Sequence, residues 1–257
     1  YDGTWTNYSP HKNNMLDLYQ LGLNSNTNVA IRGGNDKTSY YTSLSYKKAR
    51  STSEKNTFER YSFLLKGSHK ISDRVEVSAA MSFTNSNPKN SPRTVGERFV
   101  NPNGTIMTPM LDVNYFRDKY LGEHGGLAST SYGDKYGSVP GRDLFFMIDK
   151  YDYSQKETVV RPQMEVNVQI LDWLRFKADA NMNYYYTKFE EKQLGSGYAN
   201  EGGKYTMGQT TKEQATFGGT FTVNKQIQDF SVGGFARYEY YTCLLYTSDA
   251  ADEARSV

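Results

Sequence analysis

The sequence lacks several features that would point directly to a class of protein. It contains no run of about 18 apolar residues, which excludes a transmembrane helix. Its 30 basic and 28 acidic residues nearly balance, and no basic run is interleaved with aromatic residues. A general attraction to polyanions is therefore not expected. We predict no nucleic-acid partner.

Histidine and reactive motifs are also scarce. The three histidines, His11, His69 and His124, lie far apart in different connections, and no serine stands in a Gly-x-Ser-x-Gly elbow. Asp149 and Asp152 lack the dense spacing of oxygen ligands found in calcium loops. We predict no catalytic residue, no metal and no cofactor, and we expect that the protein is not an enzyme.

The only cysteine, Cys243, opens the segment "CLLYTSDAADEARSV", where the pattern of the preceding residues changes abruptly. This tail, residues 243–257, looks like a translated sequencing adapter, and we predict that it is non-native. The remainder is then free of cysteine, which suits an exported protein. The chain also begins without a charged and apolar leader, so we expect it to be truncated at both ends.

Aromatic residues, in contrast, are abundant. The chain has 22 Tyr and 13 Phe, far more than a disordered chain carries, yet only 37% of its residues are hydrophobic. Such a composition indicates an ordered protein without a large dry core. A membrane barrel with a wet interior fits, because half of each strand stays polar while the other half meets lipid.

Strict alternation of apolar and polar residues supports strands. In "DRVEVSAAMSFTNSNP", alternate positions from Val75 to Phe83 are apolar, while those from Arg74 to Thr84 are mostly polar. The same pattern returns in seven further segments: residues 28–34, 38–47, 58–67, 159–170, 173–187, 214–224 and 229–241. This predicts about eight strands. Alternation alone leaves open whether the apolar face meets lipid or the core of a soluble sheet.

The connections separate these two possibilities. Short turns alternate strictly with longer links, and the longest link runs from residue 87 to 156. Short periplasmic turns and long extracellular loops are typical of outer-membrane barrels. Tyrosines also gather near strand ends, where their rings suit the lipid headgroup boundary. The predicted fold is therefore all-β, an antiparallel transmembrane β-barrel of which residues 1–242 form a part.

One extended stretch resembles a known family. Residues 28–88 contain a Gly-Gly turn followed by Thr-Ser-Tyr-Tyr, an Arg-Tyr-Ser strand, a Lys-Ile-Ser-Asp turn and a strand ending in Asn-Ser-Asn-Pro. This ordered combination resembles the SusC/RagA family of TonB-linked outer-membrane transporters. The resemblance implies a larger barrel closed by a plug, which is absent here, and energy relayed through TonB. It further implies a SusD-like lipoprotein lid, import of an oligosaccharide or peptide, and location in the bacterial outer membrane with its lipid.

Two groups of residues are candidates for function. If the strand register is right, charged side chains project into the lumen, where we expect them to pair with each other and with the plug: Arg60, Arg161, Glu165, Arg175, Lys177, Asp179, Arg237 and Glu239. The long link is rich in aromatic and arginine residues that suit either docking of the lid and loop packing, which we favour, or substrate contact: Tyr115, Arg117, Tyr120, Tyr132, Tyr136, Arg142, Tyr151 and Tyr153.

Three other functions share part of this pattern. A soluble β-rich module that binds glycans would need its apolar faces to meet in a core. A passive porin would share the strand pattern, and only the resemblance above separates it from an energised importer. An outer-membrane hydrolase would need a serine and a histidine converging at one strand level, and no such pair is found in the sequence.

Overall fold

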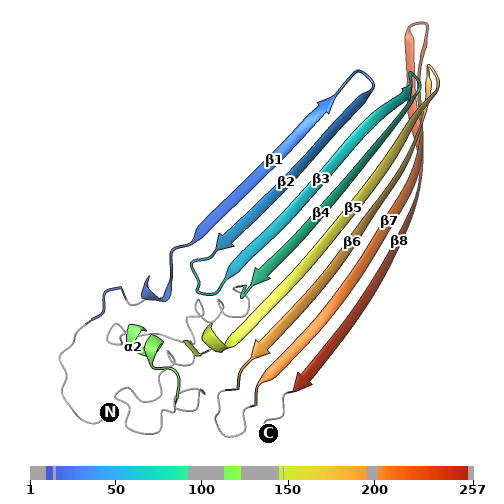
Figure 1. Ribbon diagram of the computed structural model, residues 1–257. Coiled ribbons are helices and arrows are strands. Elements are labelled where there is room, and N and C mark those ends of the chain that lie inside the picture. The colour runs from blue at the N-terminus through green and yellow to red at the C-terminus, as the bar shows by residue number, and fades with distance from the viewer. Residues whose placement is uncertain are drawn as a thin grey trace, which may run out of the picture.

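The structure is a computed structural model that describes residues 10–13, 16–91, 113–122, 145–146, 148–195 and 202–253. Its main feature is one antiparallel sheet of eight strands in the order of the sequence, so that β1 and β8 are the two edges (Figure 1). The strands are β1 (Leu23–Gly34), β2 (Thr38–Arg50), β3 (Thr57–Ser72), β4 (Val75–Lys89), β5 (Tyr151–Leu171), β6 (Leu174–Gln193), β7 (Lys204–Ile227) and β8 (Phe230–Glu253). The all-β, antiparallel prediction is confirmed, and the open sheet is consistent with part of a barrel.

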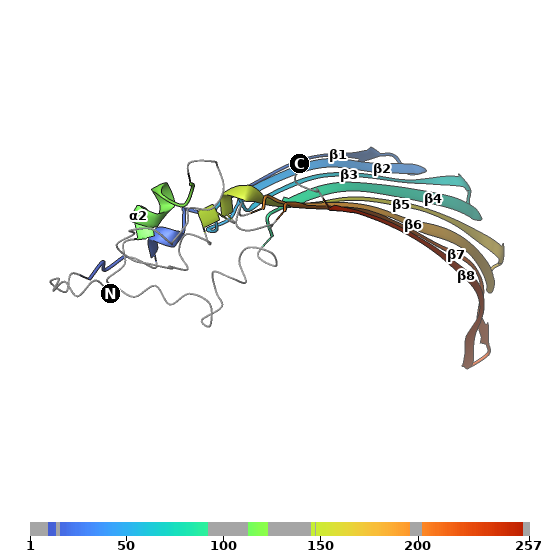
Figure 2. The ribbon, with the colours of Figure 1, turned by 90° about the horizontal axis from the view of Figure 1, so that it is seen from below.

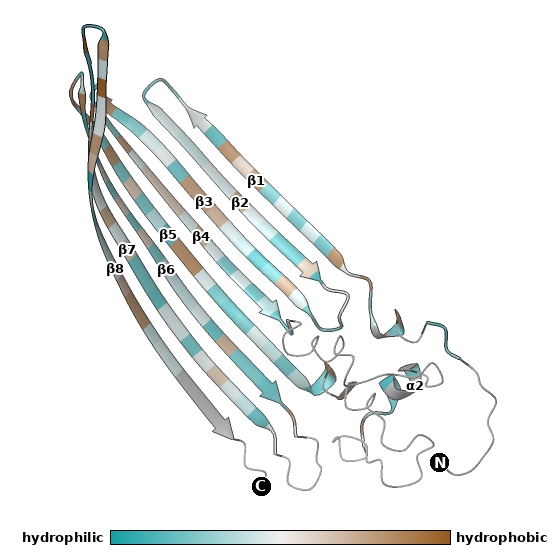
Figure 3. Ribbon diagram, turned by 180° about the vertical axis from the view of Figure 1, so that it is seen from behind, coloured by the Kyte–Doolittle hydropathy of each residue, from teal (hydrophilic) through white to brown (hydrophobic). Residues whose placement is uncertain are grey.

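The strand register gathers the alternating residues into two continuous faces. Val29 lies opposite Leu44, Leu44 opposite Phe63, and Phe63 opposite Phe83. Phe83 in turn lies opposite Val160 on β5. Because successive side chains of a strand point to opposite sides, these residues share what we call the apolar face, and their sequence neighbours form the polar face. Figure 3 shows the resulting alternation of brown and teal along the strands.

The apolar face has no protein layer over it among the described residues. Leu44 is 59% exposed, Met164 53% and Phe217 52%, although each is a large hydrophobic residue within a regular strand. The buried hydrophobic residues of the described chain are Phe145, Phe146, Ile148 and Val159, and the first three of these precede β5. Four buried side chains are far too few to cover the apolar face of eight strands.

All short turns lie at one end of the sheet and all longer connections at the other (Figure 1). In the β1–β2 turn, the Asn35 side-chain oxygen accepts hydrogen bonds from the amides of Lys37 and Thr38, at 3.0 and 2.8 Å. The Asn35 backbone amide donates to the Thr38 carbonyl at 2.7 Å. An asparagine turn of this kind reverses the chain within a few residues, which fixes the register of the hairpin.

Several strands extend further than the alternation predicts. The link predicted over residues 87–156 is shorter, because β4 ends at Lys89 and β5 begins at Tyr151. Strand β8, expected to end near Tyr241, continues to Glu253 in register with β7. The backbone ladder persists in these extensions although both faces carry polar residues, and hydrophobic alternation cannot detect such segments. The non-native origin of residues 243–257 stays a prediction.

The sheet is strongly curved, and short helices lie beyond its loop end (Figure 2). Two of them are the 3₁₀ helix η1 (Leu16–Leu18) and the helix α2 (Val113–Asp118). No helix in the described part of the chain is long and apolar enough to cross a membrane. The curvature hollows the sheet, and this hollow is where the charged residues of the polar face meet.

Candidate functional site

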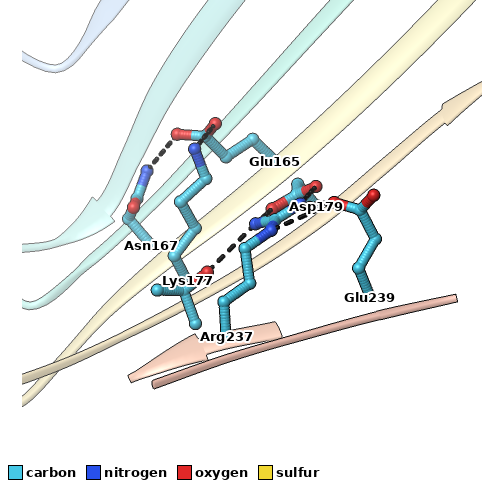
Figure 4. Close-up of polar contacts among 7 residues, drawn as sticks. Glu165, Asn167, Lys177, Asp179, Arg237 and Glu239 are labelled. Atoms are coloured by element: carbon cyan, nitrogen blue, oxygen red, sulfur yellow. Dashed lines mark hydrogen bonds and ion pairs between the residues drawn. The ribbon is translucent and has the colours of Figure 1, made fainter. Parts of the chain in front are cut away.

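The polar face carries a hollow of about 1040 Å³, lined in part by Arg32, Lys66, Glu165, Asp179 and Arg237. The register also places every charge that was expected to project inward on this one face, on strands β3, β5, β6 and β8: Arg60, Arg161, Glu165, Arg175, Lys177, Asp179, Arg237 and Glu239. Five of the eight, Glu165, Lys177, Asp179, Arg237 and Glu239, form the ion-pair cluster drawn in Figure 4.

Two carboxylates of this cluster would repel each other without a cation between them. Glu165 on β5 lies directly opposite Asp179 on β6, and like charges in that position destabilise a sheet. The Lys177 ammonium lies 2.6 Å from Glu165, whose other oxygen accepts a hydrogen bond from the Asn167 side chain at 2.7 Å. Asp179 has a separate partner, so each carboxylate is neutralised locally.

Arg237 on β8 is that partner, and it reaches across an intervening strand. Its two terminal nitrogens donate to the two oxygens of Asp179 at 2.7 and 3.0 Å, and one of them also lies 2.7 Å from Glu239. The Thr220 hydroxyl accepts a further bond at 3.0 Å. A two-pronged arginine–carboxylate pair fixes orientation as well as charge, so this contact ties β6 to β8.

The strand between them makes room through Gly218, a residue that the sequence prediction missed. A Cβ atom there would lie 2.4 Å from an Arg237 nitrogen and 2.8 Å from an Asp179 oxygen. Any side chain would therefore displace the pair. The signal was present in the sequence, because glycine inside a strand pattern often marks a close approach of other groups.

The remaining three of these eight charges, Arg161, Arg175 and Arg60, are spread along the same face. The Arg161 guanidinium lies 5.6 Å from the centre of the Tyr185 ring, and the Arg175 Nε donates to the Gln169 side chain at 3.1 Å. Arg60 is exposed, opposite Lys47 on β2 and Ser86 on β4. Positive and negative groups are thus interspersed along the polar face.

At the loop end, Arg117 packs within the protein. It pairs with Glu54, donates to the Asp17 carbonyl at 2.7 Å, and its guanidinium lies 4.9 Å from the centre of the buried Phe145 ring. Phe146 packs edge-on against Tyr151, with ring centres 6.3 Å apart. Arg117 and Tyr151 are thus engaged in intramolecular packing, one of the two roles expected for this region.

Asp149 anchors the chain before β5 to the β2–β3 connection. The Lys55 ammonium donates to its carboxylate at 2.9 Å and to its backbone carbonyl at 2.6 Å, and Lys150 pairs with its second oxygen at 2.8 Å. Hydrogen bonds from Lys150 and Lys55 hold the pKa of Asp149 far below its ordinary value. Burial, together with a hydrogen bond to Asp149, raises the pKa of the Tyr120 phenol.

Asn90 joins the end of β4 to the start of β5. It is 6% exposed and has a φ of 49°, in the left-handed region that asparagine tolerates. Its backbone amide donates to the Tyr153 carbonyl at 2.7 Å, and its side-chain oxygen accepts a hydrogen bond from the Tyr153 backbone amide at 2.8 Å. Neither Asn90 nor Lys55 was predicted as important, because alternation carries no information about a connection.

The other predicted loop residues divide into two groups. Tyr115 belongs to α2, while Tyr151 and Tyr153 belong to β5 instead of a loop, and the Tyr153 hydroxyl donates to Gln155 at 3.0 Å. The predicted residues Tyr132, Tyr136 and Arg142 lie outside the described residues. Contact of these tyrosines and arginines with a substrate or a lid protein stays a prediction.

Comparison with known proteins places the fold. No protein-family profile and no curated protein sequence matches this chain. Among solved structures, it is similar to chains of the RagAB peptide importer in its open-open state, with a TM-score of 0.69 at 17% identity over 93% of this chain. The closed-closed state gives 0.68 at 16% over 92%, and a structure described as the RagAB peptide transporter gives 0.67 at 17% over 92%. The chain spans 26% of the length of each, so the likeness concerns the fold of part of those chains.

Proposed function

We propose that this chain forms part of the barrel wall of an outer-membrane transporter that imports a bulky nutrient. The observation that supports this most directly is the contrast between the two faces of the sheet. One face is apolar and uncovered over eight strands, and the opposite face is polar, hollowed and lined by paired charges. A soluble module that binds glycans would have to bury that apolar face under a second layer. A barrel wall leaves it to lipid and keeps the charges in the wet interior.

The finer proposal is a TonB-dependent importer of the SusC/RagA type. In this proposal, the paired charges of the polar face contact a plug, and the loop end, which carries η1 and α2, contacts a SusD-like surface lipoprotein. Support comes from the resemblance of residues 28–88 and from the likeness in fold to the RagAB structures. The substrate is an oligosaccharide or a peptide, and the peptide named for RagAB makes peptides the first class to test.

The proposal is tested with the parent gene in its host. Deleting the gene should abolish growth on one class of bulky nutrient, either peptides or oligosaccharides, while growth on the corresponding monomers continues. Inactivating TonB in the complemented strain should abolish it again. Growth that returns without TonB would identify a passive porin, and recovery of the protein in the soluble fraction would favour the glycan-binding module.

A further inference from the structure

Beyond the apolar face, toward the loops, the same side of the sheet becomes basic. Following β5 from Val160 toward its start, the residue that shares its face four positions away is Lys156. On β6, Lys188 stands in the same relation to Tyr184, and Lys156 and Lys188 lie directly opposite each other. Lys192 on β6 and Lys89 on β4 also belong to this side. The register is unbroken over these residues, so the change from apolar to basic occurs along one surface.

A row of tyrosines marks the boundary between the two zones. Tyr46, Tyr61 and Tyr186 lie on this side at one level of the sheet, with Asn85 and Thr158 between Tyr61 and Tyr186. The ring centres of Tyr46 and Tyr61 are 4.8 Å apart. Tyrosine rings favour the interface between hydrocarbon and headgroups. Lys188 follows Tyr186 by two residues, about 7 Å along a strand. The headgroup zone adds roughly 5 to 7 Å to each side of a bilayer, so the lysines stand at its depth.

The lysines also surround a hollow with an excess of positive charge. It measures about 270 Å³ and is lined by Lys89, Lys156, Lys188 and Lys192, with Asp152 and Glu190 as the acidic residues. Glu190 pairs with Lys188 at 2.9 Å, and Asp152 accepts from the Asn90 side chain at 3.4 Å. Lys89, Lys156 and Lys192 are exposed, and Lys192 lies 5.9 Å from the centre of the Tyr205 ring.

We propose that this basic hollow binds the phosphate groups of an anionic lipid headgroup in the outer leaflet. The inference rests on the proposed membrane location, because only that location puts the lysines beside headgroups. Lysine suits the task, since its long apolar stem lies along the sheet while the ammonium reaches the polar zone. Its compact charge also pairs with phosphate. A partner protein is less well matched, because the excess of positive charge in the hollow fits phosphate groups better than the mixed surface of a protein.

The test uses the full protein encoded by the parent gene, purified from outer membranes and stripped of lipid. Its binding of lipid A with both phosphates is measured by native mass spectrometry. The site variant is Lys156→Gln with Lys192→Gln, which leaves the Lys188–Glu190 pair intact. The matched control is Lys47→Gln with Lys212→Gln, two lysines of the polar face. We expect the site variant to weaken binding about tenfold or more, and the control to change it less than about twofold.

Each remaining outcome overturns the proposal in a different way. Equal binding of lipid A by both variants would show that Lys156 and Lys192 do not bind it. Equal binding of dephosphorylated lipid A would show that the phosphates are not recognised. Displacement of lipid A by millimolar inorganic phosphate alone would show that the hollow is a site for free anions rather than for a lipid. If the protein spans the membrane but binds no lipid A, this inference fails and the transporter proposal survives. If it is not a membrane protein, both fail.

Discussion

Arg237 and Asp179 form a two-pronged ion pair although their strands, β8 and β6, are not neighbours. The pair crosses β7 above Gly218, where a Cβ atom would come within 2.4 Å of the guanidinium. A contact over an intervening strand stiffens the sheet beyond its backbone ladder, because it couples two hairpins. In the proposed barrel, we expect this pair to face the plug.

Replacing Gly218 by alanine should therefore break this pair. We expect Gly218→Ala to lower the thermal midpoint of the full protein modestly and to remove most of the effect of Asp179→Asn when the two are combined, since both act on one contact. The matched control is Gly219→Ala on the other face, where the nearest side-chain atom to an added Cβ is 3.5 Å away. Additive effects of Gly218→Ala and Asp179→Asn on the thermal midpoint would show that the two substitutions do not act on one contact.

The two faces should respond oppositely to a charge. Met81, 40% exposed on the apolar face, and Ser82, its neighbour on the polar face, make a matched pair. We expect Met81→Lys to cost about 2 to 4 kcal/mol of unfolding free energy in a bilayer, and Ser82→Lys to cost less than about 1 kcal/mol. Urea unfolding of the full protein refolded into vesicles gives both values. Equal costs would mean that the apolar face does not meet hydrocarbon.

Asn90 should tolerate replacement poorly. Asn90→Ala leaves the Tyr153 amide without its side-chain acceptor and puts a Cβ-only residue at a positive φ, so we expect a loss of about 1 to 3 kcal/mol. Asn90→Asp keeps an acceptor oxygen and tolerates the same backbone, and serves as the control. Hydrogen exchange at the Tyr153 amide reports the change directly. Protection that is equal in the alanine and aspartate variants would contradict this role.

The anchor at Asp149 predicts a dependence on acid. Its pKa is depressed in the folded protein, so its contribution is complete above the ordinary aspartate value near 3.9 and fades as the pH falls below it. Limited proteolysis of the loops should be constant from about pH 8 to 5 and rise in more acidic solution. Asp149→Asn should be more susceptible at neutral pH and lack the acid step. If proteolysis of Asp149→Asn still rises in acidic solution, the rise comes from another titrating group.

Sequence reasoning reached the sheet because alternation reports it directly. Val75 to Phe83 and Val160 to Ile170 repeat with a period of two, and the register then followed from the short turns that join the strands. It missed the start of β5 at Tyr151, because Ser154, Lys156 and Glu157 are polar on both faces. Hydrogen-bonded backbone continues where hydrophobic alternation has stopped.

The candidate site was reached only in part for a similar reason. The alternation of side chains along each strand assigned Glu165, Lys177 and Asp179 to one face, but it could not show which charges form ion pairs. The pairing of Asp179 with Arg237 depends on the β6–β7–β8 register and on the space above Gly218. The basic hollow joins residues from β4, β5 and β6, which no single segment of sequence reveals.

The central claim, that one face of this sheet meets lipid and the other water, is tested most directly on β4. Single cysteines are placed in turn on the apolar face and on the polar face of the full protein, in which any native cysteine is first replaced by serine. Each is labelled with a fluorophore in vesicles and quenched from each phase. The positions are Val77, Ala79 and Met81 for the first face, and Ser78, Ala80 and Ser82 for the second. We predict that nitroxide lipids quench the first set and a water-soluble quencher the second. Quenching of both sets by the water-soluble agent alone would contradict the barrel.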